Sequence, residues 1–369
     1  MYVTTFIRLV MQDMLRITHP LNHPDKNLES AINWLCLAHD KSANDGVSYG
    51  YSIMGGWRPA YIETSGYIAT TFFNLAEKFN KTSYRDRAIR IGHWLCDAQN
   101  KDGSFSNPTY HPERGIVFDT GQDLFGLVRT YKETGEINFL DAAQRAGNWL
   151  VKIADEEGRW TRNTHLGIPH VYNTRTAWAL LQLNEINPAE DQLRVARANL
   201  DWAVSQENNG FFDNCAFEAD KAPFTHTIAY AIRGLWESAQ LLQDNSYAEV
   251  ALRAAIATMR HVADDGFIPG QIDAKGIARA NYCCLTGNAQ LAIIWAKMYN
   301  ETGESHFKQS AIKALLYVMA RQDIQTKNSN IRGAIKGSYP IWGHYSPLTF
   351  PNWPTKFFID AMLLCREWM

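Results

Sequence analysis

The sequence carries no excess of charge of either sign, and this excludes one broad group of partners. Its 36 Lys and Arg residues nearly balance 38 Asp and Glu residues, which gives a net charge of −2. Proteins that bind nucleic acid or an anionic membrane surface through electrostatics carry a clear basic excess. No stretch approaches the roughly eighteen uncharged apolar residues that a membrane-spanning helix needs. We therefore expect no nucleic-acid partner and no membrane span.

The chain is also poor in cysteine, with six residues and no CxxC pair. A chain of 369 residues does not depend on a disulfide framework, and isolated cysteines favour a reducing compartment. The first twenty residues are apolar, but Arg8, Asp13 and Arg16 interrupt them and no small-residue cleavage site follows. We therefore expect no signal peptide and predict a cytoplasmic location.

Motifs for cofactors and for several catalytic mechanisms are absent as well. The sequence contains no GxGxxG, GxxxxGKS/T, HExxH or GxSxG pattern, and no acidic DxDD or DDxxD signature. Cys283, Cys284 and His344 are zinc-ligand types, but adjacent cysteines on a helix point about 100° apart. No second motif supports such a site. We expect no cofactor and no metal, and interpret Cys283 and Cys284 as small buried residues.

Apolar and aromatic residues are abundant, at 46% and 12% of the chain, and predict a globular protein with a large core. An internal repeat organises this core. A tryptophan recurs at spacings of 60, 55 and 53 residues, at Trp34, Trp94, Trp149 and Trp202. A glycine turn follows each of these, at Gly46, Gly103, Gly158 and Gly210, and a fifth turn lies at Gly266.

Two sets of helical segments alternate along the chain. The amphipathic set is expected at roughly 27–39, 84–99, 138–155, 189–206, 247–263 and 305–322. The second set is more apolar around its circumference and is expected at roughly 62–80, 119–133, 173–186, 226–242, 281–300 and 352–367. Since a helix that is apolar all round is buried, we predict an all-α protein with outer and inner helices. We expect a single domain, residues 1–369, which includes a short N-terminal extension of about residues 1–25.

The stretch WLCDAQNKDGSF at 94–105 resembles the QW-type repeat of squalene cyclases. Nearly the whole chain resembles the α/α toroid superfamily, also called the (α/α)6 barrel. This superfamily includes terpene cyclases, protein prenyltransferases, glycoside hydrolases, polysaccharide lyases and sugar epimerases, so the resemblance does not select one reaction. It implies that the loops leading into the inner helices line one mouth of a central cavity.

The loop before the third inner helix favours a reaction on a uronic acid. A proton beside a carboxylate becomes removable when the carboxylate charge is offset and a base is positioned. Asn173 and Arg175 are the predicted carboxylate clamp, and His170 or Tyr172 is the predicted base. This set looks like that of toroidal polysaccharide lyases. The alternative is structural, with Asn173 as a helix cap and Arg175 in an ion pair.

Two carboxylates at the starts of the first two inner helices support a different reaction. Glu63 and Asp119 would form the acid and base pair of a glycosidase. Neighbouring residues that are predicted to bind substrate are Trp57, Arg58, Tyr61 and Gln122. The structural alternative is that Asp119 caps its helix and that Glu63 interacts with a helix dipole.

The last repeat carries an insertion in the loop that begins at about residue 333. Its stretch WGHYSPLTFPNWPTKFF at 342–358 predicts a sugar-binding wall. Pro347, Pro351 and Pro354 frame aromatic, amide and ammonium groups, and such rings stack on pyranose faces. The residues predicted to bind substrate here are Trp342, His344, Tyr345, Asn352, Trp353 and Lys356, with His226 and Tyr282 on neighbouring loops. Tyr345 or His226 is also the predicted acid. The alternative is that the insertion only plugs the ring.

The preferred hypothesis is an enzyme acting on a uronic-acid-containing poly- or oligosaccharide by proton abstraction, as a lyase or C5-epimerase does. An inverting glycoside hydrolase that uses Glu63 and Asp119 is the first alternative. A non-catalytic glycan-binding toroid is the second. A terpene-type cyclase is least favoured, because its acidic motif is absent.

Overall fold

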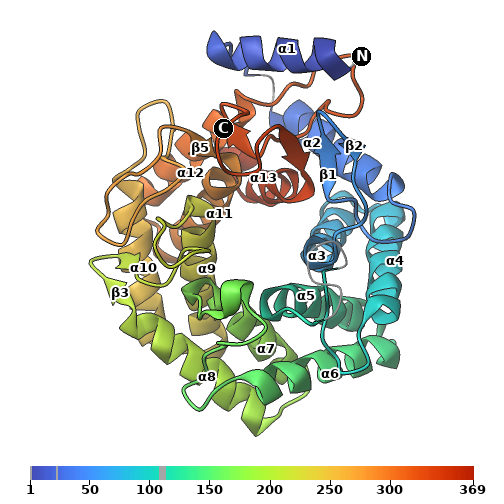
Figure 1. The fold of residues 1–369 in the computed structure, drawn as a ribbon, viewed down its shortest axis with the longest axis vertical. Helices are drawn as coiled ribbons and strands as arrows, with labels where there is room; N and C mark the ends of the chain where they lie inside the picture. Colours follow the sequence, from blue (N-terminus) through green and yellow to red (C-terminus); the bar gives the residue numbers. More distant parts are fainter. Residues whose placement is uncertain (1, 22–23, 108–113) are drawn as a thin grey trace.

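The computed structural model describes residues 2–21, 24–107 and 114–369, and twelve of its helices form two concentric rings (Figure 1). The inner ring consists of α3 (Ile62–Phe79), α5 (Val117–Thr134), α7 (Thr174–Ile186), α9 (Thr225–Leu242), α11 (Leu285–Thr302) and α13 (Asn352–Cys365). The outer ring consists of α2 (Pro24–Asp40), α4 (Thr82–Ala98), α6 (Ile137–Ile153), α8 (Glu190–Ser205), α10 (Asn245–Met259) and α12 (Ser305–Met319). Helix α1 (Tyr2–Met14) lies outside both rings. Short 3-10 helices occupy His165–Gly167 (η1), Val171–Asn173 (η2) and Arg366–Trp368 (η3).

Helices from the two ends of the chain close the rings. Each inner helix packs against its inner neighbours, and the last one, α13, packs against the first one, α3. The outer helix α2, which begins the ring, packs on α13, which completes it. The result is the (α/α)6 toroid that the sequence predicts.

The inner helices begin close to the predicted positions. They start at residues 62, 117, 174, 225, 285 and 352, where the sequence predicts 62, 119, 173, 226, 281 and 352. The largest difference is at α11. It arises because Cys283–Cys284 form a strand, β5, that pairs with β6 (Ser338–Tyr339) of the insertion.

Strand pairing holds the insertion across one mouth of the ring. Strand β7 (Thr349–Pro351) pairs with β1 (Gly50–Ser52), which also pairs with β2 (Gly56–Trp57). A separate hairpin of β3 (Glu207–Asn208) and β4 (Phe211–Phe212) lies on the loop after α8. The end of the chain is thereby attached to the loop that precedes the first inner helix.

Helix α1 fastens the insertion from the outside. Asp13 is 3% exposed, and its carboxylate accepts hydrogen bonds from the Lys336 ammonium group and the Ile341 N–H. Arg8 forms an ion pair with Asp323 at 3.1 Å. These buried contacts fix the segment that precedes α13.

The repeated glycine turns pack each loop against the next outer helix. A Cβ atom at Gly103 would overlap the carbonyl oxygen of Arg145 on α6, and one at Gly266 would overlap that of Lys313 on α12. The same contact recurs at Gly333, against α2, in a sixth turn that the sequence repeat did not reveal. Close backbone approach therefore explains why glycine recurs in these turns.

The repeated tryptophans differ in their burial. Trp34 and Trp149 are buried, whereas Trp94 and Trp202 are half-buried. Trp34 stacks on Trp57, and its indole N–H donates to the Asn330 carbonyl at 2.8 Å. Trp34 thus packs against residues of the loops at this end of the ring.

The contact at Gly103 predicts a stability effect that can be separated from backbone strain. Gly103 and Gly135 both have positive φ, at +94° and +72°, but a Cβ atom at Gly135 would meet nothing within 4 Å. We expect Gly103→Ala to lower the free energy of unfolding by about 1–3 kcal/mol more than Gly135→Ala does, as overpacking would. Urea denaturation of both variants measures this difference. Equal losses would mean that the turn does not pack tightly against α6.

Candidate active site

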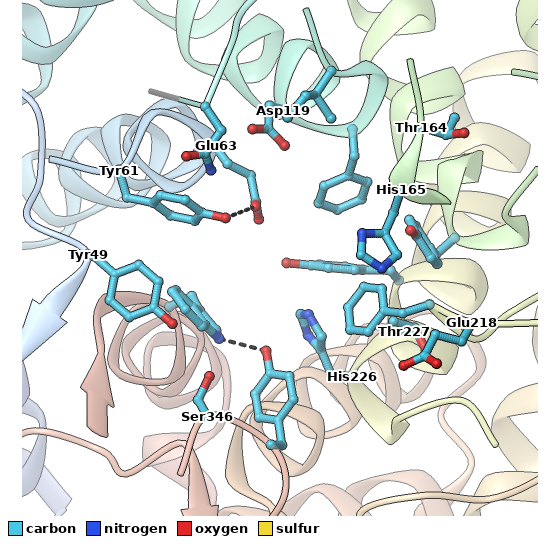
Figure 2. A pocket seen from close by; sticks show the side chains of 18 residues that line it. Tyr49, Tyr61, Glu63, Asp119, Thr164, His165, Glu218, His226, Thr227 and Ser346 are labelled. Atoms are coloured by element: carbon cyan, nitrogen blue, oxygen red, sulfur yellow. Dashed lines mark hydrogen bonds between the residues drawn. The ribbon is translucent and has the colours of Figure 1, made fainter. Parts of the chain in front are cut away.

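One mouth of the ring contains a cavity of about 490 Å³ (Figure 2). Its lining comes from the starts of α3, α5, α9 and α13, from η2, and from the loops before them. The lining residues are Tyr49, Tyr61, Glu63, Asn107, Ile116, Phe118, Asp119, Thr164, His165, Tyr172, Phe217, Glu218, His226, Thr227, Tyr230, Tyr345, Ser346 and Trp353. Approaches to five of the six inner helices therefore converge on one cavity, as expected for a toroid.

Glu63 and Asp119 bring two carboxyl groups to this cavity from the first turns of α3 and α5 (Figure 2). The Tyr61 hydroxyl donates to Glu63 Oε2 at 2.9 Å. Burial raises the pKa of Glu63 from 4.5 to about 7. Burial, together with the negative charge of Glu63, raises the pKa of Asp119 well above its usual value. Such a pair holds a proton near neutral pH, so that one carboxyl group is an acid while the other is ionised.

A third buried carboxyl group, Asp123, lies one turn further along α5. It packs against Gly66 of α3, and it does not belong to the cavity lining. Burial raises its pKa well above the usual value, and the charges of Asp119 and Glu63 act in the same direction. Asp123 was not among the predicted residues, although its position four residues after Asp119 places both on one face of the helix.

Aromatic residues of the insertion form the wall beside the carboxyl pair. The Trp353 indole N–H donates to the Tyr345 hydroxyl at 2.7 Å, and both rings line the cavity. They are only 8% and 6% exposed, so each presents an edge or a small part of a face. Trp342 is 44% exposed and lies outside the lining. The insertion therefore contributes to the cavity and also covers the ring.

His226 and Tyr230 form the wall opposite Glu63, one helical turn apart on α9. Figure 2 shows the His226 ring facing the cavity across from Glu63 and Tyr61. Burial lowers the pKa of His226 to about 3. The imidazole is therefore neutral near pH 7, and it is available as a hydrogen-bonding group and not as a cation.

Arg175 lies beneath the cavity on the axis of the ring. Its guanidinium group lies between 4.8 and 5.8 Å from five ring centroids, each contributed by a different inner helix. This axial cage consists of Tyr67, Phe125, Trp178, Tyr230 and Phe357. Arg175 Nε donates to Gln122 Oε1 at 2.5 Å, and burial lowers the pKa of Arg175 to about 10. Arg175 therefore remains charged but does not line the cavity, so it does not reach the place expected for a carboxylate clamp.

Lys356 is also buried in the centre of the ring. Its ammonium group lies 2.6 Å from the Asp360 carboxylate and 4.3 Å from the centroid of Phe357. Burial lowers the pKa of Lys356 to about 8. Like Arg175, Lys356 supports the floor of the cavity and does not line it.

The segment 170–175 does not present its polar groups together. His170 is buried outside the lining, and its two ring nitrogens lie 2.9 Å from the carbonyl oxygens of Ala216 and His165. Tyr172 does line the cavity, and its ring stacks on that of His170. Asn173 is the N-cap residue of α7, but its side chain makes no capping hydrogen bond. His170 thus joins two loops, in contrast to the exposed base expected from the sequence.

The remaining residues predicted to bind substrate lie around the cavity without lining it. Trp57 donates from its indole to Asn330 Oδ1, and Tyr282 donates from its hydroxyl to Gln271. Asn352 is buried, and its amide donates to the Ser48 carbonyl and the Thr64 hydroxyl. The others in this group are Arg58, Gln122, Trp342, His344 and Lys356. The predicted residues that do line the cavity are Tyr61, Glu63, Asp119, Tyr172, His226, Tyr345 and Trp353.

Several lining residues were not predicted, among them Tyr49, Phe118, His165, Glu218 and Tyr230. Two features of the sequence could have identified three of these residues. His165 and Glu218 lie in the loops that lead into α7 and α9, the segments where the site was expected. Tyr230 follows His226 by four residues on an inner helix, so the two share a face.

Neither a metal site nor a membrane span is found among the described residues. No cluster of three or more His, Cys, Asp or Glu side chains is placed to hold a metal ion there. No helix in residues 2–21, 24–107 and 114–369 is both long and apolar enough to cross a bilayer.

The raised pKa of Glu63 predicts a stability change with pH. The unfolded chain releases this proton near pH 4.5 and the folded chain near pH 7, so folding loses stability as pH rises through this window. Glu63→Gln keeps an acceptor for Tyr61 and removes the charge. We expect the variant to be more stable than the wild type at pH 8 by up to about 3 kcal/mol, and to lose this advantage below pH 4.5. Urea denaturation at both ends of the window tests this, and an unchanged difference would contradict it.

No family model matches the sequence, and no curated protein matches it. Among solved structures, the chain is similar to unsaturated glucuronyl hydrolase from Bacillus sp. GL1, with a TM-score of 0.73 and 15% identity over 92% of this chain and 96% of that one. An unsaturated glucuronyl hydrolase specific for heparin has a TM-score of 0.73 and 14% identity over 93% and 97% of the two chains. Cellobiose 2-epimerase from Bacillus thermoamylovorans B4167 has a TM-score of 0.70 and 12% identity over 98% and 99%. These likenesses establish that the chain has the fold of the (α/α)6 toroid enzymes.

Proposed function

We propose that this protein is a carbohydrate-active enzyme that hydrolyses a glycosidic bond at the end of a uronic-acid-containing oligosaccharide. The observation that carries the proposal is the pair of buried carboxyl groups, Glu63 and Asp119, in one cavity with raised pKa values. Glycosidases use such a pair. The protonated carboxyl group protonates the leaving oxygen, and the ionised one activates water or attacks the sugar.

The closed floor of the cavity supports action on a terminal unit. Arg175 and the axial cage fill the centre of the ring, and Tyr230 of this cage also lines the cavity. A sugar chain can then approach from the open mouth only, with its end inserted. A cavity of about 490 Å³ is within the usual range for small ligands, and suits one or two sugar rings.

Two features support an acidic sugar. Residues from the starts of α3, α5, α9 and α13 line the cavity, so the positive ends of these helix dipoles lie beside it. This arrangement favours an anionic group such as a uronate carboxylate. Two of the similar structures are glucuronyl hydrolases, which is consistent with a uronic acid as the recognised unit.

Proton abstraction, by a lyase or an epimerase, is the second candidate. It is supported by the neutral His226 imidazole on the cavity wall and by the likeness to cellobiose 2-epimerase. The base expected from the sequence fits less well. His170 is outside the lining, and burial raises the pKa of Tyr172 well above 10, which makes its phenolate hard to form. Hydrolysis by the carboxyl pair is therefore preferred.

A reducing, cytoplasmic setting belongs to the same proposal. All six cysteines are free thiols, at Cys36, Cys96, Cys215, Cys283, Cys284 and Cys365. Free cysteines are usual where thiols are kept reduced. The substrate would then be an oligosaccharide that has been imported or is made inside the cell.

A screen of acidic and neutral oligosaccharides, read for reducing ends and for near-ultraviolet absorbance, tests the reaction class. Hydrolysis of a saturated sugar produces reducing ends without a change in near-ultraviolet absorbance. Removal of an unsaturated uronyl end lowers this absorbance, whereas a lyase raises it. We expect new reducing ends on acidic oligosaccharides, with constant or falling absorbance. A rise in absorbance would indicate elimination in place of hydrolysis. No change in either readout on any sugar would contradict hydrolysis and leave an epimerase or a binding protein.

Variants of the carboxyl pair test the mechanism on the sugar that the screen identifies. We expect Glu63→Gln and Asp119→Asn each to lower kcat by at least about 10²-fold, since a general acid or base typically contributes 10²–10⁴-fold. His170→Ala is the control outside the lining, and its folded fraction should retain far more activity. The opposite pattern, with His170 essential and Glu63 dispensable, would favour proton abstraction over hydrolysis as the reaction.

A pair of Trp→Ala variants tests which part of the insertion binds sugar. Trp353 lines the cavity and Trp342 does not. We expect Trp353→Ala to raise KM about tenfold with a smaller change in kcat, because stacking is equal in the ground state and transition state. Trp342→Ala should leave both constants within twofold. Equal effects of the two changes would show that Trp353 does not bind the sugar from the cavity wall.

A further inference from the structure

The hydrogen bonding of His226 leaves one ring nitrogen for a ligand. Its Nδ1 lies 3.0 Å from Gln290 Oε1 of α11, and both side chains are buried. Among the described residues, Nε2 has no such protein partner, and the ring lines the cavity. The two nitrogens of this imidazole therefore have different surroundings.

The structure gives the orientation of the Gln290 amide, because its carbonyl oxygen, and not its amide nitrogen, is the atom next to His226 Nδ1.

A carbonyl oxygen can only accept, so His226 Nδ1 must carry the proton of the neutral ring. A neutral imidazole has one donor and one acceptor nitrogen, and the hydrogen bond at one nitrogen sets the role of the other. Nε2 is then the acceptor. The positive charge of Arg175, in the axial cage below, also opposes protonation of this ring.

We propose that Gln290 is a positioning residue that holds neutral His226 as its Nδ1–H tautomer, so that Nε2 accepts a hydrogen bond from a sugar hydroxyl. The tautomer follows from the protein alone, and the sugar part rests on the proposed function. The site then selects a unit with a free hydroxyl at this point. A deoxy sugar or an O-substituted sugar leaves the buried acceptor unpaired and binds less well.

Nitrogen-15 NMR of uniformly labelled protein tests the tautomer without any substrate. The His226 signals are identified by their loss in His226→Asn. We expect Nδ1 to have the shift of a protonated nitrogen and Nε2 that of a bare nitrogen, from pH 5.5 to 8. A proton on Nε2 in the wild type would overturn the proposal.

Three variants at glutamine positions separate positioning from folding. Gln290→Met removes the acceptor with little change in volume, and should move a measurable fraction of the proton to Nε2. Gln290→Glu keeps an oxygen acceptor, and should keep Nδ1 protonated. Gln192→Met is the matched control on the outer helix α8, where Gln192 is also buried, and it should not affect His226. If Gln290→Met and the wild type show the same tautomer, Gln290 does not set it.

Kinetics on the sugar identified by the screen test the second half of the proposal. We expect Gln290→Met and His226→Asn each to raise KM about tenfold, as loss of one hydrogen bond does. The double variant should be no worse than the more affected single variant, because both remove the same contact. Multiplicative losses would show that Gln290 does not act through His226. If no sugar is turned over, the proposed function fails, whereas the NMR experiment still tests the tautomer of His226.

Discussion

Closure of the inner ring is the constraint on which the site depends. Helix α13 packs between α11 and α3, and it also packs on α2 from the start of the ring. Once the ring is closed, the inner helices are held around a common axis. Their approaches therefore meet at a single mouth, and the carboxyl pair and the aromatic wall occupy it. Strands β1 and β7 join the two ends of the chain at this same mouth.

The charges inside the ring are arranged in layers along its axis. Glu63 and Asp119 lie at the cavity, whereas Arg175 and Lys356 lie beneath it among aromatic rings. Burial raises the pKa of the carboxyl groups and lowers that of the cations, so every one of these groups resists ionisation. Such an interior costs stability, and it suits chemistry in which a carboxyl group must donate a proton near neutral pH.

The sequence was sufficient to predict the helices and the ring. Hydrophobic periodicity located five of the six inner-helix starts within two residues, and the turn repeat indicated the hairpins. It also paired Glu63 with Asp119, because first turns of neighbouring inner helices face the same mouth. Asp123 and Gln290 were missed, since their importance depends on partners that are distant in the sequence.

The segment 170–175 shows why the rest of the site could not be predicted. Four polar residues within this six-residue segment looked like a catalytic set, but the chain turns from a loop through η2 into α7 there. Successive side chains consequently point in different directions, with Tyr172 in the cavity, His170 between loops and Arg175 on the axis. Where a helix begins, residues that are adjacent in the sequence therefore need not face the same site.

The mechanism depends on Glu63 and Asp119 sharing a proton near neutral pH. Carbon-13 NMR of the side-chain carboxyl groups, recorded from pH 3 to 9, measures this most directly. We expect Glu63 to titrate near pH 7 and Glu63→Gln to lower the titration midpoint of Asp119, because a neighbouring negative charge is removed. If both groups titrate near pH 4 and neither responds to substitution of the other, Glu63 and Asp119 do not share a proton.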